Sequence, residues 1–232
     1  MDAFLHLLRE KQVLTVKPVG GNSGKGVSFF SHHNSEFYIN DSKVEKQELI
    51  DFVQGLDNFI ITEFVKQHSY ARELYPGTTN TIRVVTIREP ETGRISVPVA
   101  AHRIGTNKSF PVDNVSGGGL SAWIDVEQGT IGKAIRKIDF LNGTGFLENH
   151  PDTGSQIYNV KIPHWDLLLK QLVLAMEHLP KVHFIAWDVV ITDDSFSVVE
   201  VNASTGIYVF QMHQPLLRNP ELKRFYEYHR VI

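Results

Sequence analysis

A glycine-rich segment between two strand-forming stretches limits most strongly what this chain can fold into. Residues 16–27 read VKPVGGNSGKGV. The segment is not a Walker loop, because Gly24-Lys25 is followed by Gly26, and it is not a dinucleotide fingerprint, because Phe29 stands where a glycine is required. We therefore expect a β-hairpin flap whose backbone N–H groups and lysines can bind a polyphosphate. The alternative is a surface hairpin whose glycines only serve its turn.

The composition excludes several classes of protein. The chain has 232 residues, enough for one large domain or two small lobes. Its formal net charge of −3 provides no basic field for nucleic acid. The absence of cysteine excludes disulfides, thiolate metal sites and a cysteine nucleophile, and fits a cytoplasmic location. No hydrophobic run approaches the about 20 residues of a membrane-spanning helix.

The order of predicted elements indicates an α+β protein with two lobes. Residues 1–65 read as helix, hairpin, strand, helix and strand, with Asp41-Ser42 as cap signals for a helix over 44–54. Residues 66–232 read mainly as antiparallel hairpins with a long helix and a C-terminal helix. We expect a small lobe that carries the flap and a larger lobe that carries the chemistry.

The last predicted hairpin, residues 184–204, places two carboxylates opposite each other. A turn at 193–195 pairs Thr192 with Phe196, and counting back in steps of two places Asp188 opposite Glu200. Side chains alternate across a strand, so the other face should lie in the core. That face carries Trp187, Val189, Ile191, Val199 and Val201.

Opposed carboxylates suggest a cation. Like charges directly opposite each other cost roughly 0.2–1 kcal/mol, and more when they are desolvated. Asn202 shares the face of Asp188 and Glu200, and together they offer hard oxygen ligands suited to Mg²⁺ or Mn²⁺ carried with phosphates. The alternative is a turn of different length, with one acid facing solvent.

Further polar residues suggest a basic cleft for a phosphate and a carboxylate. Arg83 lies within a run of strand formers, which is costly without an anionic partner. His102 and Arg103 end the next strand, and Asp113 and Asn114 precede a second glycine-rich loop. Taken one at a time, each of these is better explained as a surface ion pair, and only together do they suggest the cleft.

An ordered set of motifs is similar to those of the ATP-grasp superfamily, and most similar to its sugar-transfer-associated branch, which is related to the α-L-glutamate ligases. The motifs cover the chain from about residue 10. They are VKPVGGNSGKGV, TEFV, NTIRVVT, RIG, VDNVSGGGL, HPDTG, IPHW, AWDVVIT and VVEVNAS.

This resemblance implies a fold and a reaction. Two α+β lobes would clasp ATP between the glycine-rich flap and a metal-bearing sheet. ATP would phosphorylate a small-molecule carboxylate, and an amine would attack the acyl phosphate and leave ADP and phosphate. The substrates would be sugar or amino-acid building blocks.

The resemblance also implies roles for individual residues. Lys17 and Arg83 would be catalytic, Lys17 at the nucleotide and Arg83 at the transferring phosphate. Asp188, Glu200 and Asn202 match the magnesium ligands. The branch motifs assign His102, Arg103, Asp113 and Asn114 loosely to substrate or phosphate. The nucleotide-binding positions are Lys17, the flap residues Gly20, Gly21, Ser23, Gly24, Lys25 and Gly26, and the adenine-contacting segment Glu63, Phe64 and Val65.

One departure from the family pattern leaves alternatives open. ATP-grasp enzymes usually carry a preceding domain and an earlier phosphate-binding lysine, whereas this chain begins almost at the flap. A partner chain or a second copy could therefore complete the site. The alternative functions are a non-catalytic or partner-dependent ATP-binding module and a small-molecule kinase that uses the same site.

Overall fold

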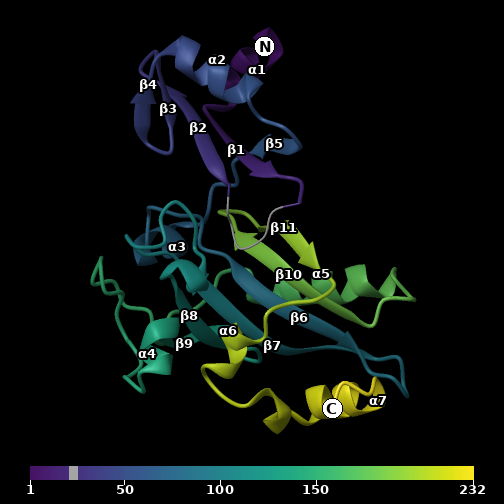
Figure 1. Ribbon diagram of the computed structural model, residues 1–232. Helices are drawn as coiled ribbons and strands as arrows, with labels where there is room; N and C mark the ends of the chain where they lie inside the picture. Colours follow the sequence, from purple (N-terminus) through teal and green to yellow (C-terminus); the bar gives the residue numbers. More distant parts are fainter. Residues whose placement is uncertain (21–25) are drawn as a thin grey trace. The chain divides into compact units, whose positions relative to one another are not determined.

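Two antiparallel sheets organise the part of the chain that the computed structural model describes, residues 1–20 and 26–232. Each sheet belongs to one of two units, Met1–Val65 (unit 1) and Lys66–Ile232 (unit 2). Both units combine a sheet with helices, so the predicted α+β class is confirmed (Figure 1). None of the described helices has the length and apolar character needed to cross a bilayer.

Unit 1 is a five-stranded sheet with two helices. Its strands are arranged in the order β4-β3-β2-β1-β5, with every neighbouring pair antiparallel. The elements are α1 (Asp2–Lys11), β1 (Val13–Pro18), β2 (Ser28–His33), β3 (Glu36–Ile39), β4 (Ser42–Val44), α2 (Lys46–Gln54) and β5 (Phe59–Glu63).

The helices of unit 1 are held by a small apolar core. Leu5 and Leu8 lie three residues apart on one side of α1, and both are buried with Leu49 of α2. They pack with Leu14 of β1 and Phe30 of β2. Each such side chain contributes about 1.5–3 kcal/mol when fully buried.

The predicted cap at Asp41-Ser42 is wrong. Asn40 and Asp41 have φ of 48° and 66° and form the turn between β3 and β4, and Ser42 is the first residue of β4. Asn and Asp tolerate this left-handed conformation, so the pair closes a hairpin instead of starting a helix. The Asn40 side chain also accepts a hydrogen bond from the Phe29 backbone N–H (2.8 Å), which favours the hairpin.

Unit 2 is built on a six-stranded sheet in the order β11-β10-β6-β7-β8-β9. Its neighbouring strands are antiparallel. The elements are α3 (Ser69–Leu74), β6 (Ile82–Arg88), β7 (Ile95–Ile104), η1 (Val115–Gly117), β8 (Leu120–Asp125), β9 (Thr130–Arg136), α4 (Lys137–Leu141), α5 (Trp165–Glu177), β10 (Phe184–Ile191), β11 (Phe196–Asn202), α6 (Tyr208–Gln211), η2 (Leu216–Arg218) and α7 (Pro220–Tyr228).

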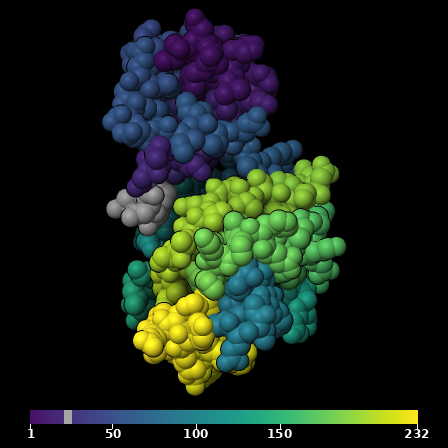
Figure 2. Space-filling model, turned by 90° about the vertical axis from the view of Figure 1, so that its right-hand side faces the viewer, coloured from purple at the N-terminus to yellow at the C-terminus, as the bar shows by residue number. Residues whose placement is uncertain are grey.

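The two faces of this sheet have separate cores. On one face, Leu168, Leu172 and Met176 of α5 pack with strand residues such as Trp187. The other face is covered by α6, η2 and α7, through residues such as Phe225. An ion pair between Arg94 and Glu221 (2.5 Å) ties α7 to the β6–β7 turn, and Figure 2 shows these two segments in contact (yellow and blue).

The β10–β11 hairpin places Asp188 opposite Glu200, as predicted, but by a different route. Phe196 pairs with Ile191 and not with Thr192, so the turn is one residue tighter than expected. The register then shifts between Asp188 and Val189, because β11 contains one extra residue there. The extra residue of the bulge offsets the residue missing from the turn. Beyond the bulge the pairing therefore returns to the predicted register, and Asp188 lies opposite Glu200.

The predicted core face of β11 is also wrong. Trp187, Val189 and Ile191 of β10 are buried, whereas Val201 is 54% exposed and Val199 is half-buried. The reason is that β11 is the last strand of the sheet and β10 lies between β11 and β6. Alternation along a strand decides which face a side chain takes, but not whether that face is covered at the edge of the sheet.

Candidate functional site

Three adjacent strands bring the predicted charged residues to one face of the unit 2 sheet. Arg83 of β6 pairs in register with Asp188 of β10 and with Ala101 of β7. Arg103 lies two residues beyond Ala101 and therefore shares its face. The burial of these charges is nearly complete, with side-chain exposure of 1% for Asp188, 13% for Arg83 and 17% for Arg103.

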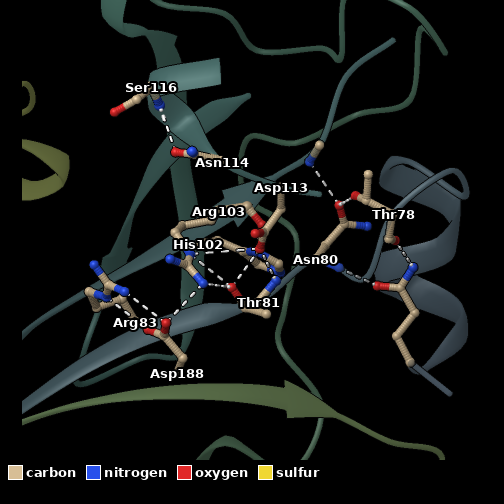
Figure 3. Close-up of polar contacts among 12 residues, drawn as sticks. Thr78, Asn80, Thr81, Arg83, His102, Arg103, Asp113, Asn114, Ser116 and Asp188 are labelled. Atoms are coloured by element: carbon tan, nitrogen blue, oxygen red, sulfur yellow. Dashed lines mark hydrogen bonds and ion pairs between the residues drawn. The ribbon is translucent and has the colours of Figure 1, made fainter. Parts of the chain in front are cut away.

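Both arginines bind Asp188 (Figure 3). Arg83 donates from Nε to Oδ1 and from Nη2 to Oδ2, each at 2.7 Å, and Arg103 donates from Nη2 to Oδ2 at 3.0 Å. Burial alone would raise the pKa of Asp188, but Arg103 and Arg83 outweigh burial and hold this pKa below its ordinary value. Asp188 is therefore a carboxylate that two guanidinium groups share.

Arg103 is held in place by Thr81 and Asp113. Its Nε and Nη2 donate to Thr81 Oγ1 at 2.8 and 2.6 Å. Asp113 Oδ2 accepts from the backbone N–H of Thr81 (2.8 Å) and from its hydroxyl (2.5 Å), and lies 3.7 Å from Arg103 Nε. A continuous chain of contacts thus runs from Asp113 through Thr81 and Arg103 to Asp188 (Figure 3).

The electrostatics of Arg103 follow from this packing. Burial alone would lower the pKa of its guanidinium, but Asp113, Asp188 and Glu200 outweigh burial and raise this pKa above its ordinary value. The side chain is therefore a permanent cation, and three carboxylates stabilise it.

All four residues predicted to bind substrate have structural partners inside unit 2, and those of Arg103 are Thr81, Asp113 and Asp188. Asp113 supports Thr81, and the Oδ1 of Asn114 accepts from the Ser116 backbone N–H (2.9 Å) at the start of η1. His102 is fully buried and lies within hydrogen-bond distance of the Tyr70 hydroxyl (3.0 Å) and of the Arg103 carbonyl (3.1 Å). Of the four, Arg103 is the one that contacts Asp188.

His102 lies on the opposite face of β7 from Arg103. Its imidazole contacts Tyr70 of α3, a residue of the core on the α5 side of the sheet. Burial lowers the pKa of His102 to about 4, so the ring is neutral near pH 7. Its surroundings suit a core hydrogen bond and not contact with a substrate.

The predicted metal ligands fit a divalent cation by their donor chemistry. Asp188 and Glu200 are directly opposed, and Asn202 follows on the same strand as Glu200. Asn202 Nδ2 is a buried atom without a hydrogen-bond partner among the described residues, and rotating the amide would present its oxygen instead. No three His, Cys, Asp or Glu side chains of the described chain gather as a metal cluster, so the amide would be needed as the third ligand.

The nucleotide-binding positions predicted in unit 1 lie on β1, on β5 and next to the glycine-rich segment. Lys17 belongs to β1 and is in register with Ile60 of β5. Gly20 and Gly26 flank the segment, and Gly26 has a φ of 78°, a conformation that favours glycine. The remaining predicted flap residues, Gly21, Ser23, Gly24 and Lys25, lie outside the described residues.

The predicted adenine-contacting segment ends unit 1. Glu63 is the last residue of β5, and its carboxylate pairs with Lys11 at 2.8 Å. The Phe64 ring packs edge-on against Phe29 of β2, with ring centroids 5.7 Å apart. Val65 follows as the last residue of the unit.

Sequence reasoning missed Tyr208 and gave Thr81 no role. The Tyr208 hydroxyl lies 2.8 Å from the Ser116 hydroxyl, and the Lys137 ammonium lies 5.3 Å from the centre of the Tyr208 ring. Tyr208 also contributes to the raised pKa of Arg103. The only sequence signal for Tyr208 is its position a few residues after Asn202.

A comparison with protein families identifies one match. Residues 1–225 match the family described as "Sugar-transfer associated ATP-grasp". No curated protein matches the chain.

Solved structures are also similar. "ATP-grasp ligase PsnB complexed with precursor peptide PsnA2 and AMPPNP" has 14% identity and a TM-score of 0.46, and covers 96% of this chain and 50% of that chain. A Chryseobacterium gregarium RiPP-associated ATP-grasp ligase in complex with ADP and a leader and core peptide has 9% identity, a TM-score of 0.40 and the same coverage. The chain thus spans about half the length of the solved structures it matches.

Proposed function

The chain belongs to the sugar-transfer associated ATP-grasp family, and on this premise we propose that it is an ATP-dependent carboxylate–amine ligase. In the first step a carboxylate oxygen takes the γ-phosphoryl group of ATP, which gives an acyl phosphate and ADP. In the second step an amine attacks the acyl carbon, phosphate leaves and the amine loses a proton. The product is an amide.

The observation that carries the proposal is the cluster on the unit 2 sheet. Asp188 and Glu200 are opposed on neighbouring strands, and Arg83 and Arg103 lie against Asp188. Phosphoryl transfer depends on neutralising and orienting charge, and cations next to carboxylates on a rigid sheet suit this task.

The roles of the unit 2 residues follow from their contacts. Asp188, Glu200 and Asn202 would hold Mg²⁺ or Mn²⁺, and the ion would neutralise phosphate oxygens. The contacts of Arg83 with Asp188 use Nε and Nη2, so within the described residues its Nη1 remains available for a phosphoryl oxygen. Arg103 attracts the substrate carboxylate, and Asp113 acts on Arg103 through Thr81.

In unit 1, we assign nucleotide binding to Lys17, to Gly20 through Gly26 and to the segment Glu63, Phe64 and Val65. Lys17 supplies a cation for phosphate oxygens. The backbone of Glu63–Val65 would meet the adenine edge, since the Glu63 side chain is exposed and already paired with Lys11.

The first test is a calorimetric titration of ATP with Mg²⁺ and then with EDTA. We expect binding that requires the metal and is weakened at least tenfold by Glu200→Gln, because an amide is a poorer ligand than a carboxylate. Glu148→Gln is the matched control, since Glu148 is an exposed acid paired with Lys133 in the same unit. Unchanged Mg·ATP affinity in Glu200→Gln would exclude the metal assignment.

The nucleotide assignment in unit 1 needs its own variant. Lys17→Ala should raise the apparent KM for ATP or abolish turnover, whereas Lys43→Ala, an exposed lysine paired with Glu36, should not. Wild-type kinetics for Lys17→Ala would remove this residue from the site.

The reaction class is tested by product analysis. The ligase predicts ADP release that depends on both a carboxylate and an amine, and hydroxylamine should trap the acyl phosphate as a hydroxamate. A stable phosphorylated alcohol would indicate a kinase instead. Tight Mg·ATP binding with no turnover over a broad panel of carboxylates would indicate a binding module.

A further inference from the structure

Three polar side chains from separate segments of unit 2 meet at Tyr208. Ser116 belongs to η1, Lys137 is the first residue of α4, and Tyr208 is the first residue of α6. The Tyr208 hydroxyl lies 2.8 Å from the Ser116 hydroxyl, and the Lys137 ammonium lies 5.3 Å from the centre of the Tyr208 ring. Tyr208 therefore contacts both of the others, and we call the three residues the Tyr208 trio.

The trio lies next to the charged cluster. Ser116 follows Asp113 by three residues, and Asp113 lies 3.7 Å from Arg103 (Figure 3). Tyr208 is also one of the residues that raise the pKa of the Arg103 guanidinium. A molecule bound at the cluster would thus lie close to the trio.

Packing holds the Tyr208 ring in place. A Cβ atom added at Gly206 would lie 3.0 Å from a carbon of this ring, so the ring packs closely against the backbone at Gly206. On the other side of the contact, the Ser116 backbone N–H donates to Asn114 Oδ1 (2.9 Å), which fixes the start of η1. The trio is therefore a built arrangement and not a chance approach of mobile side chains.

The glycine-rich loop beside Ser116 uses its own backbone donors internally. The N–H groups of Gly117 and Gly119 donate to the Asn114 carbonyl, and that of Gly118 donates to the Val115 carbonyl. These donors are not free for a ligand, so binding here depends on side chains. The two hydroxyls of the trio share one hydrogen bond, and within the described residues the second hydroxyl hydrogen has no acceptor.

A second lysine of the same unit shows what Lys137 lacks. The Lys133 ammonium lies 5.5 Å from the centre of the Tyr158 ring, a similar geometry, but it also pairs with Glu148 at 2.8 Å. Lys137 has no carboxylate within 4.0 Å among the described residues, and the nearby Asp139 pairs with Arg136. The positive charge of Lys137 is thus not compensated by a contact, and it attracts an anion.

We propose that the Tyr208 trio binds an oxyanion of the substrate, a carboxylate or phosphoryl group distinct from the carboxyl group that reacts. The Lys137 ammonium supplies the charge, and one hydroxyl of the trio donates a hydrogen bond. The substrates therefore include a molecule with an acidic group besides the reacting one. The proposal rests on the ligase function, because that function supplies the substrate at the neighbouring cluster.

The test is a titration of protein labelled with 3-fluorotyrosine, followed by fluorine NMR. The chain has seven tyrosines, and Tyr208→Phe identifies the Tyr208 signal. At constant ionic strength, glutarate and inorganic phosphate should shift this signal with saturation, whereas propylamine should not. The anion with the lower Kd shows whether the trio prefers a carboxylate or a phosphoryl group. No saturable shift with either anion, or an equal shift with propylamine, would overturn the proposal.

Variants assign the binding to Lys137. This side chain is exposed, so Lys137→Gln should not disturb the fold, and it should weaken anion binding about tenfold. Lys137→Arg keeps the charge and should retain the response. The Tyr158 signal, and the Tyr208 signal in Lys133→Gln, are the matched controls: the first should not respond to anions, and the second should respond as in wild type. Unchanged binding in Lys137→Gln would overturn the proposal.

A titration with Mg·AMPPNP separates this proposal from the ligase function. An anion response that persists when Mg·AMPPNP is bound supports a substrate subsite. Displacement of the anion by the nucleotide would assign Lys137 to nucleotide phosphates and overturn the proposal. A Lys137-dependent anion response in a protein that does not bind Mg·AMPPNP would keep the trio as an oxyanion site and contradict the ligase function.

Discussion

The two units treat charged side chains differently. In unit 1 the ion pairs Lys11–Glu63 and Lys43–Glu36 lie at the surface, with at least one-third of each side chain exposed. In unit 2 the contacts of Asp188 with Arg83 and Arg103 are almost fully buried. Burying an ion pair costs several kcal/mol of desolvation, and its replacement by apolar residues is often neutral or stabilising. Unit 2 has exposed pairs as well, such as Lys133–Glu148, so what distinguishes it is that it retains a buried charged cluster despite this cost.

Acid should weaken unit 2 more than any single substitution. Burial lowers the pKa values of His102 and His213 to about 4 each. Between pH 6.5 and 4 the unfolded chain binds protons at these positions and the folded chain does not, so stability falls as the pH falls. The loss is about 3 kcal/mol for each histidine.

Tryptophan fluorescence measures this loss in unit 2 alone, since Trp123, Trp165 and Trp187 all belong to that unit. Urea unfolding at several pH values should show the decline. His102→Gln should make stability less dependent on pH, and His178→Gln, at an exposed position, should not. An unchanged pH dependence in His102→Gln would contradict the assignment.

Removing the shared anion should be the most damaging substitution. Asp188→Asn leaves Arg83 and Arg103 buried without their carboxylate, and we expect a loss of about 3–5 kcal/mol in the free energy of unfolding. The same urea titration followed by fluorescence provides the measurement. Glu148→Gln, which breaks an exposed pair in the same unit, should leave the midpoint close to wild type. Equal midpoints for the two variants would remove the contrast between buried and exposed charge.

A smaller effect is expected at the hydroxyl that joins Asp113 to Arg103. Thr81→Val keeps the shape of the side chain but removes the group that donates to Asp113 and accepts from Arg103. We expect a loss of about 2 kcal/mol, because two buried charged groups lose a partner. Thr81→Ser should recover most of the stability. If Val and Ser variants unfold alike, the methyl group and not the hydroxyl is responsible.

The smallest effect should be in unit 1. Glu63→Gln removes the pair with Lys11, but both groups are solvated and screened. Hydrogen exchange of peptides from residues 1–65, followed by mass spectrometry, should differ from wild type by no more than the error of the measurement. Strongly faster exchange across α1 would show that this surface pair stabilises unit 1 and would weaken the comparison of the two units.

Much of the β10–β11 hairpin could be predicted from sequence. Its contacts are local, and alternation of side chains relates residues that lie twelve positions apart, as for Asp188 and Glu200. The extra residue in β11 could not be predicted, because strand-forming residues surround it on both sides. The opposition of the two acids was nevertheless correct, since the tighter turn and the bulge compensate each other.

The amino-acid sequence by itself determined the α+β class, the antiparallel hairpins and the charged residues that require partners, because propensity and side-chain alternation act between neighbours in the chain. Only the tertiary structure decided which partners those residues have. Thr81 meets Asp113 across 32 residues, and Arg83 meets Asp188 across 105. The same assembly separated His102 from Arg103, although they are adjacent in sequence, because opposite faces of β7 lead to a core and to a charged site. Contacts of this range depend on which strands become neighbours in the sheet, and no local pattern contains that information.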